Sequence, residues 1–294
     1  MKMLRILLML TMILLAFNVS TSFAGPIIVD HTTTDLSQIP DSWINQVKQN
    51  IKVYFGHTSH GMQITNGLLS IESQNPSKYS VAIPQWSLPN EPGALCIYDR
   101  SDTYDPGDFF PTVPGVLSAN PQINVVMYAW CGQPGNATGG WQALLNSYIS
   151  TMNSLEQRYP NVTFVYMTGN AQEADCSGCE RNHFNEALRT YCKQNNKVLF
   201  DFADLDVWYN GQRYAYASPS WCTCAGQNIP REAPQYGGGA GTGPCGHTTS
   251  ESCMEKGKAT WWLLAMIAGW NNPNPPPPPD TTPPAPPKGL RIVP

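Results

Sequence analysis

Short apolar stretches rich in β-branched and aromatic residues limit what this chain can fold into. Three of them are "IKVYFG" (51–56), "NVVMYAW" (124–130) and "VTFVYMTG" (162–169), each about as long as a typical strand. A nearly continuous apolar run of this length predicts a strand that is covered on both of its faces. The rest of the chain must therefore supply layers that cover a sheet from two sides.

Amphipathic segments separate those stretches. Residues 141–160 carry apolar side chains at three- and four-residue spacing and stop at Pro160, which predicts a helix. Further helices are expected at 60–73, 181–196 and 253–270, and a further strand at 197–204. Strands that alternate with helices at this rhythm form βαβ units. The sequence therefore predicts an α/β protein with a parallel sheet and helices on both of its faces.

Two regions depart from this alternation. Residues 75–122 are rich in Pro, Gly and Asp, and we expect them to form long functional loops. Residues 208–245 lack periodicity and contain "YGGGAGTGPCG". We expect this second region to be an excursion over the edge of the sheet, held by disulfide bonds.

The two ends of the sequence have compositions of their own. Lys2 and Arg5 precede an apolar run that closes with small residues at Ala24, a pattern that predicts a signal peptide over 1–24. The mature chain is then exported, to the periplasm or outside the cell, and no later stretch has the ~20 apolar residues of a membrane span. Residues 272–294 are rich in proline and predict a semi-rigid spacer. The last part of this tail resembles the first strand of a fibronectin type III domain.

Composition excludes one class of partner. The formal net charge is −4 and only 13% of the residues are charged. A nucleic-acid-binding surface needs clustered Lys and Arg, which this sequence does not show. The expected partner is therefore a small molecule or a glycan.

All nine cysteines follow the predicted signal peptide. They are Cys96, Cys131, Cys176, Cys179, Cys192, Cys222, Cys224, Cys245 and Cys253. In an exported protein they predict disulfides, with Cys176–Cys179 and Cys245–Cys253 as plausible local pairs. The odd number leaves at least one thiol outside the intrachain pairs. A zinc ribbon built on the CxxC and CxC spacings is the less favoured alternative, and Cys131 is expected to be either a small core residue or a reactive thiol.

Ser59 stands between the strand at 51–56 and the helix that follows it, in "VYFGHTSHG". In a parallel α/β sheet, ligands bind at the carboxyl ends of the strands, and a helix N-terminus supplies N–H groups and a positive dipole end. These are the surroundings that an activated serine requires. The simpler alternative is that Ser59 caps the helix. Late in the chain, His247 lies in a Gly- and Cys-bounded loop before the last helix, where a base can reach the same edge.

The order of these blocks resembles the SGNH (GDSL-like) hydrolase superfamily over most of residues 50–270. The blocks are "HTS" at Ser59, "NVVMYAWCGQ", "NEALRTYCKQNNKVLFDFAD", and a histidine before "KGKATWWLLA". The resemblance implies a three-layer, flavodoxin-like hydrolase domain over 25–271 that cleaves esters through an acyl-enzyme. Ser59 then matches the nucleophile and His247 the base, and no cofactor or metal is implied. The chain departs from the family where Pro244 takes the place of an aspartate three residues before the histidine.

The remaining site residues follow from the same resemblance. The oxyanion donors are predicted to be the backbone N–H of Ser59, the side chain of Gln133 and its neighbour Gly132, with Gly93 or Gly107 as a further glycine. Glu232 and Glu251 are the nearest acidic residues before and after His247 in the sequence, and one of them is a candidate partner for its imidazole. His57 and His60 either bind substrate or are buried and satisfied within the protein.

The most specific hypothesis is an exported serine hydrolase that cleaves an ester, such as an acyl or acetyl ester on a carbohydrate. A second hypothesis is a non-catalytic module that binds glycan on the same fold, with the acid lost. A third is a zinc-dependent hydrolase in which His57, His60 and His247 hold the metal.

Overall fold

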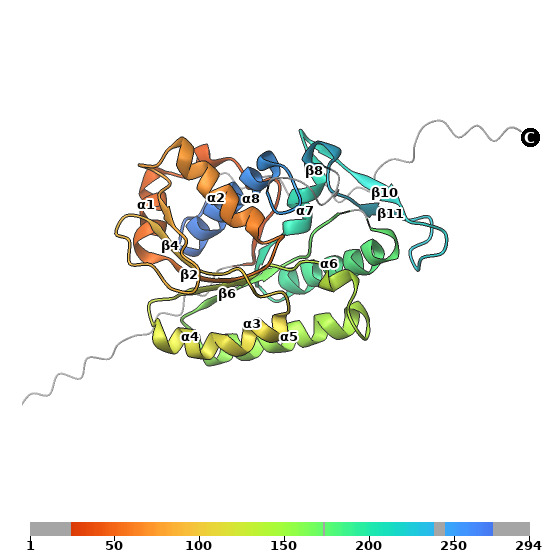
Figure 1. The fold of residues 1–294 in the computed structure, drawn as a ribbon, viewed down its shortest axis with the longest axis horizontal. Helices are drawn as coiled ribbons and strands as arrows, with labels where there is room; N and C mark the ends of the chain where they lie inside the picture. The colour runs from red at the N-terminus through yellow and green to blue at the C-terminus, as the bar shows by residue number, and fades with distance from the viewer. Residues whose placement is uncertain (1–24, 173, 238–244, 273–294) are drawn as a thin grey trace, which may run out of the picture.

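The computed structural model of the chain describes residues 25–172, 174–237 and 245–272 (Figure 1). The predicted signal peptide and nearly all of the proline-rich tail lie outside the described residues, as does Pro244. None of the helices in the described part is long and apolar enough to cross a membrane.

The centre of the molecule is a seven-stranded sheet in which every pair of neighbouring strands is parallel. Its strands, in chain order, are β1 (Ile27–Val29), β2 (Lys52–Gly56), β3 (Val81–Ala82), β4 (Leu95–Arg100), β5 (Val125–Tyr128), β6 (Thr163–Met167) and β7 (Val198–Phe200). In space they follow the order β1-β7-β6-β5-β2-β4-β3. The five central strands therefore have the flavodoxin-like order 2-1-3-4-5. β2, β5 and β6 are almost completely buried, as their apolar sequences predict.

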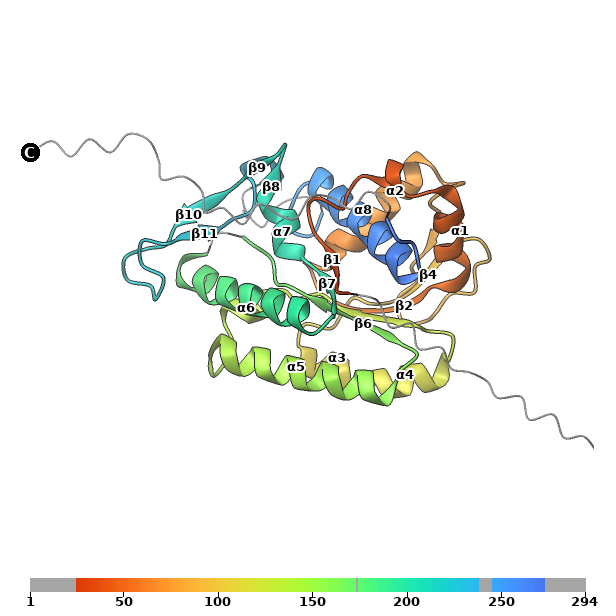
Figure 2. The ribbon, with the colours of Figure 1, turned by 180° about the vertical axis from the view of Figure 1, so that it is seen from behind.

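Helices cover both faces of this sheet (Figures 1 and 2). One layer contains α1 (Asp41–Asn50), α2 (Met62–Gln74), α7 (Phe202–Val207) and α8 (Ser250–Ile267). The other contains α3 (Pro106–Phe109), α4 (Val113–Ala119), α5 (Gly140–Arg158) and α6 (Asp175–Gln194). The predicted fold class, a three-layer α/β protein with a flavodoxin-like parallel sheet and helices on both faces, is confirmed.

The region expected to form only loops contains an internal strand of the sheet. β4 pairs with β2 along its whole length, from Lys52 opposite Cys96 to Gly56 opposite Arg100. The prediction was wrong here because the strand ends in polar residues and has Pro- and Gly-rich neighbours. The strand expected at 197–204 is also shorter than predicted, because Asp201 ends it by capping α7 with its carboxylate.

Two glycines bring α2 and α8 into close contact. A Cβ atom on Gly67 would lie 1.9 Å from the carbonyl oxygen of Cys253, and one on Gly257 would lie 2.5 Å from the carbonyl carbon of Gly67. Only glycine allows the two backbones to approach this closely. The start of α8, which follows the His247 loop, is thereby held against the helix that follows Ser59.

The segment after α7 is the predicted excursion. It forms two small antiparallel sheets, β8 (Trp208–Tyr209) with β9 (Gln212–Arg213), and β10 (Ala215–Ala217) with β11 (Asn228–Pro230). Two disulfides, Cys176–Cys222 and Cys179–Cys224, attach it to α6. The predicted Cys176–Cys179 pair is therefore wrong, whereas Cys245–Cys253 is confirmed. Cys96, Cys131 and Cys192 are free thiols.

Candidate active site

Ser59 lies in a turn between β2 and α2, at the carboxyl edge of the sheet. The N-cap of α2 is Gly61, so the alternative in which Ser59 caps this helix does not hold. Its hydroxyl instead lies 3.5 Å from the sulfur of Cys131, beyond the end of β5. The Ser59 side chain therefore points from the end of β2 toward the end of β5. In folds of this class, ligands bind at the carboxyl ends of such strands.

His247 sits at the tip of a tight turn. Gly246 and His247 both have positive φ angles, of 51° and 76°. Cys245 and Thr248 flank them and exchange two backbone hydrogen bonds of 3.2 and 3.3 Å. This is the pattern of a type I′ turn, which suits glycine but is uncommon for histidine. A non-glycine residue held in this conformation is a feature that clusters at functional sites.

This turn packs directly on the Ser59 segment. A Cβ atom on Gly246 would lie 2.4 Å from the carbonyl oxygen of Ser59, so a larger residue does not fit there. Gln63, on α2, donates a 2.6 Å hydrogen bond to the carbonyl oxygen of Gly246. The ring of His247 lies 4.8 Å from the ring of His60, measured between centroids. Folding therefore brings the loop of His247 and the turn of Ser59 together.

Glu232 supports this turn through the next residue. It is buried, and its carboxylate accepts a 2.6 Å hydrogen bond from the hydroxyl of Thr248. The disulfide Cys245–Cys253 fixes the other side of the turn to α8. Glu251, the second acidic candidate, lines a different pocket, of about 200 Å³, together with His31.

His57 is a structural residue of this loop. Its Nε2 lies 2.7 Å from a carboxylate oxygen of Asp99, and its Nδ1 lies 2.8 Å from the carbonyl oxygen of Thr58. The residue has no exposed surface. The prediction that His57 contacts substrate is therefore wrong, and the alternative, a buried and satisfied ring, is correct. Asp99 could not be singled out beforehand, because it lies in β4, a strand within the region that was expected to form only loops.

His60 is buried in a different way. Only 5% of it is exposed, its Nδ1 lies 3.1 Å from the sulfur of Cys131, and its Nε2 makes no hydrogen bond within the described structure. Burial lowers the pKa of His60 to about 4, although the side chain of Gln172 acts in the opposite direction. The imidazole is therefore neutral at pH 7. Sequence analysis singled out His60 and Cys131 but did not predict that they are in contact.

Of the predicted oxyanion residues, Gln133 and Gly132 lie in the loop of Cys131, whereas the two candidate glycines, Gly93 and Gly107, lie elsewhere. The side chain of Gln133 accepts a 2.7 Å hydrogen bond from the N–H of Cys131 and donates to the carbonyl oxygen of Tyr104, so it holds the loop that contains Gly132. Gly93 precedes β4, at the amino end of the sheet, and is therefore far from the site as a matter of topology.

Gly107 and Asn170 lie on the carboxyl side of the sheet. Gly107 follows β4 and lines a separate pocket of about 610 Å³ beside α5. Asn170, which the sequence analysis did not single out, donates a 2.9 Å hydrogen bond to the carbonyl oxygen of Cys131. The one indication in the sequence that Asn170 could belong to the site is its position just after a predicted strand.

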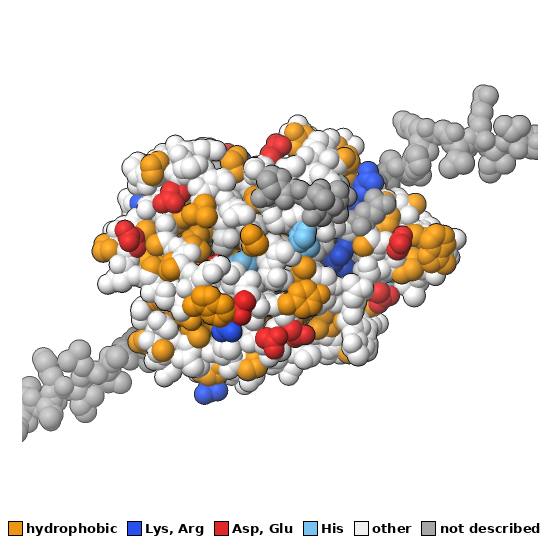
Figure 3. Space-filling model, viewed as in Figure 1, with side chains coloured by type: hydrophobic (Ala, Val, Ile, Leu, Met, Phe, Trp, Pro, Cys, Tyr) orange, Lys and Arg blue, Asp and Glu red, His pale blue; other side chains and the backbone are white. Residues whose placement is uncertain are grey.

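Apolar side chains surround the centre. Met62 is 42% exposed and lies against Gly246, and Tyr104 is 53% exposed and lies near Gly132. Histidine side chains reach the surface among hydrophobic ones on the face shown in Figure 3. Such a rim suits the apolar part of an acyl group or the face of a sugar ring.

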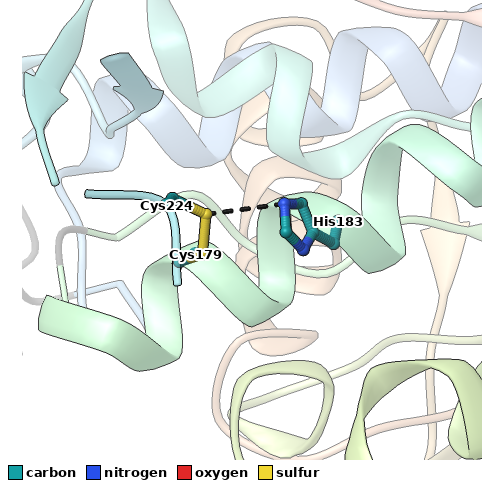
Figure 4. Close-up of side chains that lie close together, drawn as sticks. All are labelled: Cys179, His183 and Cys224. Atoms are coloured by element: carbon teal, nitrogen blue, oxygen red, sulfur yellow. Dashed lines mark hydrogen bonds between the residues drawn. A yellow bond between two sulfur atoms is a disulfide. The ribbon is translucent and has the colours of Figure 1, made fainter. Parts of the chain in front are cut away.

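Potential metal ligands gather elsewhere. Within the described residues, His57, His60 and His247 do not form a group whose ligand atoms lie within 4.8 Å of one another. Two other sets do: Asp30 with His31 and Asp204, and Cys179 with His183 and Cys224. In the second set the cysteines form a disulfide, and the Nε2 of His183 lies 3.5 Å from the sulfur of Cys224 (Figure 4). A sulfur in a disulfide is not the thiolate that zinc requires.

Comparison with known proteins adds little to this geometry. No family model and no curated protein matches the chain. Among solved structures, one match is a protein from Desulfitobacterium hafniense assigned to the G-D-S-L lipolytic family. It is 11% identical, covers 73% of this chain and 99% of its own, and has a TM-score of 0.41. A likeness this distant carries no argument about activity.

Proposed function

We propose that the protein is an exported serine hydrolase that cleaves esters through an acyl-enzyme, with an acyl or acetyl ester on a carbohydrate as the substrate class. The observation that carries the proposal is the contact between the Gly246–His247 turn and the backbone of Ser59. This contact supports the proposal because the turn that carries His247 packs against the segment that carries Ser59.

In this proposal Ser59 attacks the ester carbonyl while His247 takes its proton as general base. The tetrahedral oxyanion is held by the backbone N–H groups of Ser59 and Gly132, close to the positive end of α2. His247 then returns the proton to the departing alcohol, and water releases the acyl group by the same route. Gln133 positions the Gly132 loop, and Glu232 positions the His247 turn through Thr248.

The test is turnover of a short-chain aryl ester by wild type and four variants. Ser59→Ala should lower turnover by about 10⁴-fold or more, and His247→Ala by about 10²- to 10⁴-fold. The matched control is Ser73→Ala, an exposed serine on α2, the helix that follows Ser59, and it should leave turnover unchanged. Turnover that survives undiminished in Ser59→Ala/Cys131→Ala would exclude the proposal.

A further inference from the structure

Cys131 occupies the centre of this site, yet the proposed serine mechanism gives it no role. Its sulfur lies 3.5 Å from the hydroxyl of Ser59 and 3.1 Å from the Nδ1 of His60. It is half-buried, unlike the fully buried free thiols of Cys96 and Cys192. An accessible thiol beside an imidazole is the arrangement of a nucleophilic pair.

The backbone of Cys131 is held on both sides. Its N–H donates to the side chain of Gln133 at 2.7 Å, and its carbonyl oxygen accepts from Asn170 at 2.9 Å. Both partners are themselves buried. The sulfur therefore has a fixed position at the end of β5, as a nucleophile needs.

His60 has the properties of a base for this thiol. The ring is 95% buried, and its Nε2 makes no direct hydrogen bond in the described structure, although the side chain of Gln172 acts on the ring. Its Nδ1 faces the sulfur. His57, only three residues earlier, has partners at both nitrogens.

A buried positive charge favours the same chemistry. Arg181, on α6, is only 5% exposed, donates to the carbonyl oxygen of Gln172, and interacts electrostatically with Cys131. A nearby guanidinium stabilises a thiolate more than a thiol.

We propose that Cys131 and His60 form a second nucleophilic pair, through which this site accepts an acyl group on sulfur as well as on the oxygen of Ser59. The inference takes its substrate class, an activated acyl ester, from the proposed function. The assignment of Cys131 as a nucleophile does not depend on that function.

The reaction balances without a further reactant. The thiol proton passes to Nδ1 of His60 as Sγ bonds to the carbonyl carbon. The carbon–oxygen bond to the alcohol then breaks, and the alcohol leaves with the proton from His60. Water subsequently attacks the thioester, which releases a carboxylic acid and regenerates the thiol.

The first experiment measures alkylation of the native protein by iodoacetamide at pH 7, with modified peptides identified by mass spectrometry. Cys131 should react about tenfold faster than glutathione under the same conditions, because His60 accepts the thiol proton as the sulfur attacks. Cys96 and Cys192 are internal controls and should stay unmodified. His60→Gln should remove the acceleration at Cys131. Alkylation of Cys131 no faster than that of glutathione would overturn the proposal.

The second experiment does not depend on the folding of a His60 variant. Ser59→Ala is exposed to p-nitrophenyl acetate, quenched in acid and mapped by mass spectrometry. We expect an acetyl group on Cys131 that neutral hydroxylamine removes, as it does from thioesters, and that is missing in Ser59→Ala/Cys131→Ala. A Cys131 that stays free while added glutathione is acetylated would contradict the proposal. Because wild-type Ser59 is not required, this result is independent of the fate of the serine mechanism.

Discussion

Two histidines flank Ser59, and the structure uses them in opposite ways. His57 joins β2 to β4 through Asp99 and has a partner at each ring nitrogen. His60 has one nitrogen on Cys131 and another without a partner, and it faces His247. Both are buried, so burial does not distinguish them. The hydrogen bonds of the ring nitrogens do distinguish them. A histidine with a partner at both nitrogens supports the fold, whereas one with a nitrogen that makes no hydrogen bond remains available for chemistry.

The comparison predicts its largest energetic effect at His57. His57→Ala should lower the free energy of unfolding by about 3–5 kcal/mol, because it leaves the buried carboxylate of Asp99 without its partner. His60→Ala should cost less, about 1–2 kcal/mol, because the thiol that it leaves is only a weak hydrogen-bonding group. Urea unfolding at pH 7 measures both. Equal losses for the two variants would remove the distinction drawn between these histidines.

The pH dependence of stability tests the state of His60. Its pKa is about 4 in the folded protein because of burial, against 6.5 for the exposed group. Between those values only the unfolded chain binds the extra proton. The contribution of His60 is therefore complete above pH 6.5 and is lost as the pH falls through 4.

At about 1.4 kcal/mol for each pH unit in this window, the loss reaches up to about 3 kcal/mol. Urea unfolding between pH 7.5 and 4 measures it as the difference between wild type and His60→Gln, since other groups titrate in both proteins. Parallel curves for the two would show that the ring is not held neutral by the fold.

The last prediction on stability concerns the other side of the site, where a disulfide rather than a histidine fixes the backbone, and its expected effect on turnover is modest. Cys245→Ser/Cys253→Ser opens a loop with a sequence separation of 8 and should cost about 2 kcal/mol. Turnover should fall by about tenfold at a temperature where the variant is folded, because His247 loses its fixed place.

The control is Cys176→Ser/Cys222→Ser, which removes the disulfide between α6 and the excursion, whose two cysteines have a sequence separation of 46. It should destabilise the protein more, by about 4 kcal/mol, yet leave turnover unchanged. If both variants lose turnover in proportion to their stability, the His247 turn has no special role.

The sheet was predictable because β2, β5 and β6 are buried on both faces and therefore apolar throughout. β4 was not, because its last residues are polar: Asp99 holds His57, and Arg100 stacks on Trp86. The role of His57 could not be assigned without that strand. The disulfide pairing failed for a related reason, since two cysteines one helical turn apart on α6 both face the excursion.

In the site, the packing of the His247 turn on the Ser59 segment agrees with the order of the strands and helices predicted from the sequence. The contact between Cys131 and His60 was not, because it depends on the shape of two loops rather than on topology. Hydrogen bonds between the backbone of Cys131 and the side chains of Gln133 and Asn170 hold the loop after β5 in the shape that points the thiol toward the end of β2. No local pattern in the sequence encodes that turn.

The central claim, that Ser59 is the residue from which ester chemistry begins, is tested most directly by a fluorophosphonate probe and peptide mapping. We predict a single phosphonylated serine, Ser59, in the wild-type protein and none in Ser59→Ala. Equal labelling of both proteins, or an adduct on a different serine, would contradict the account.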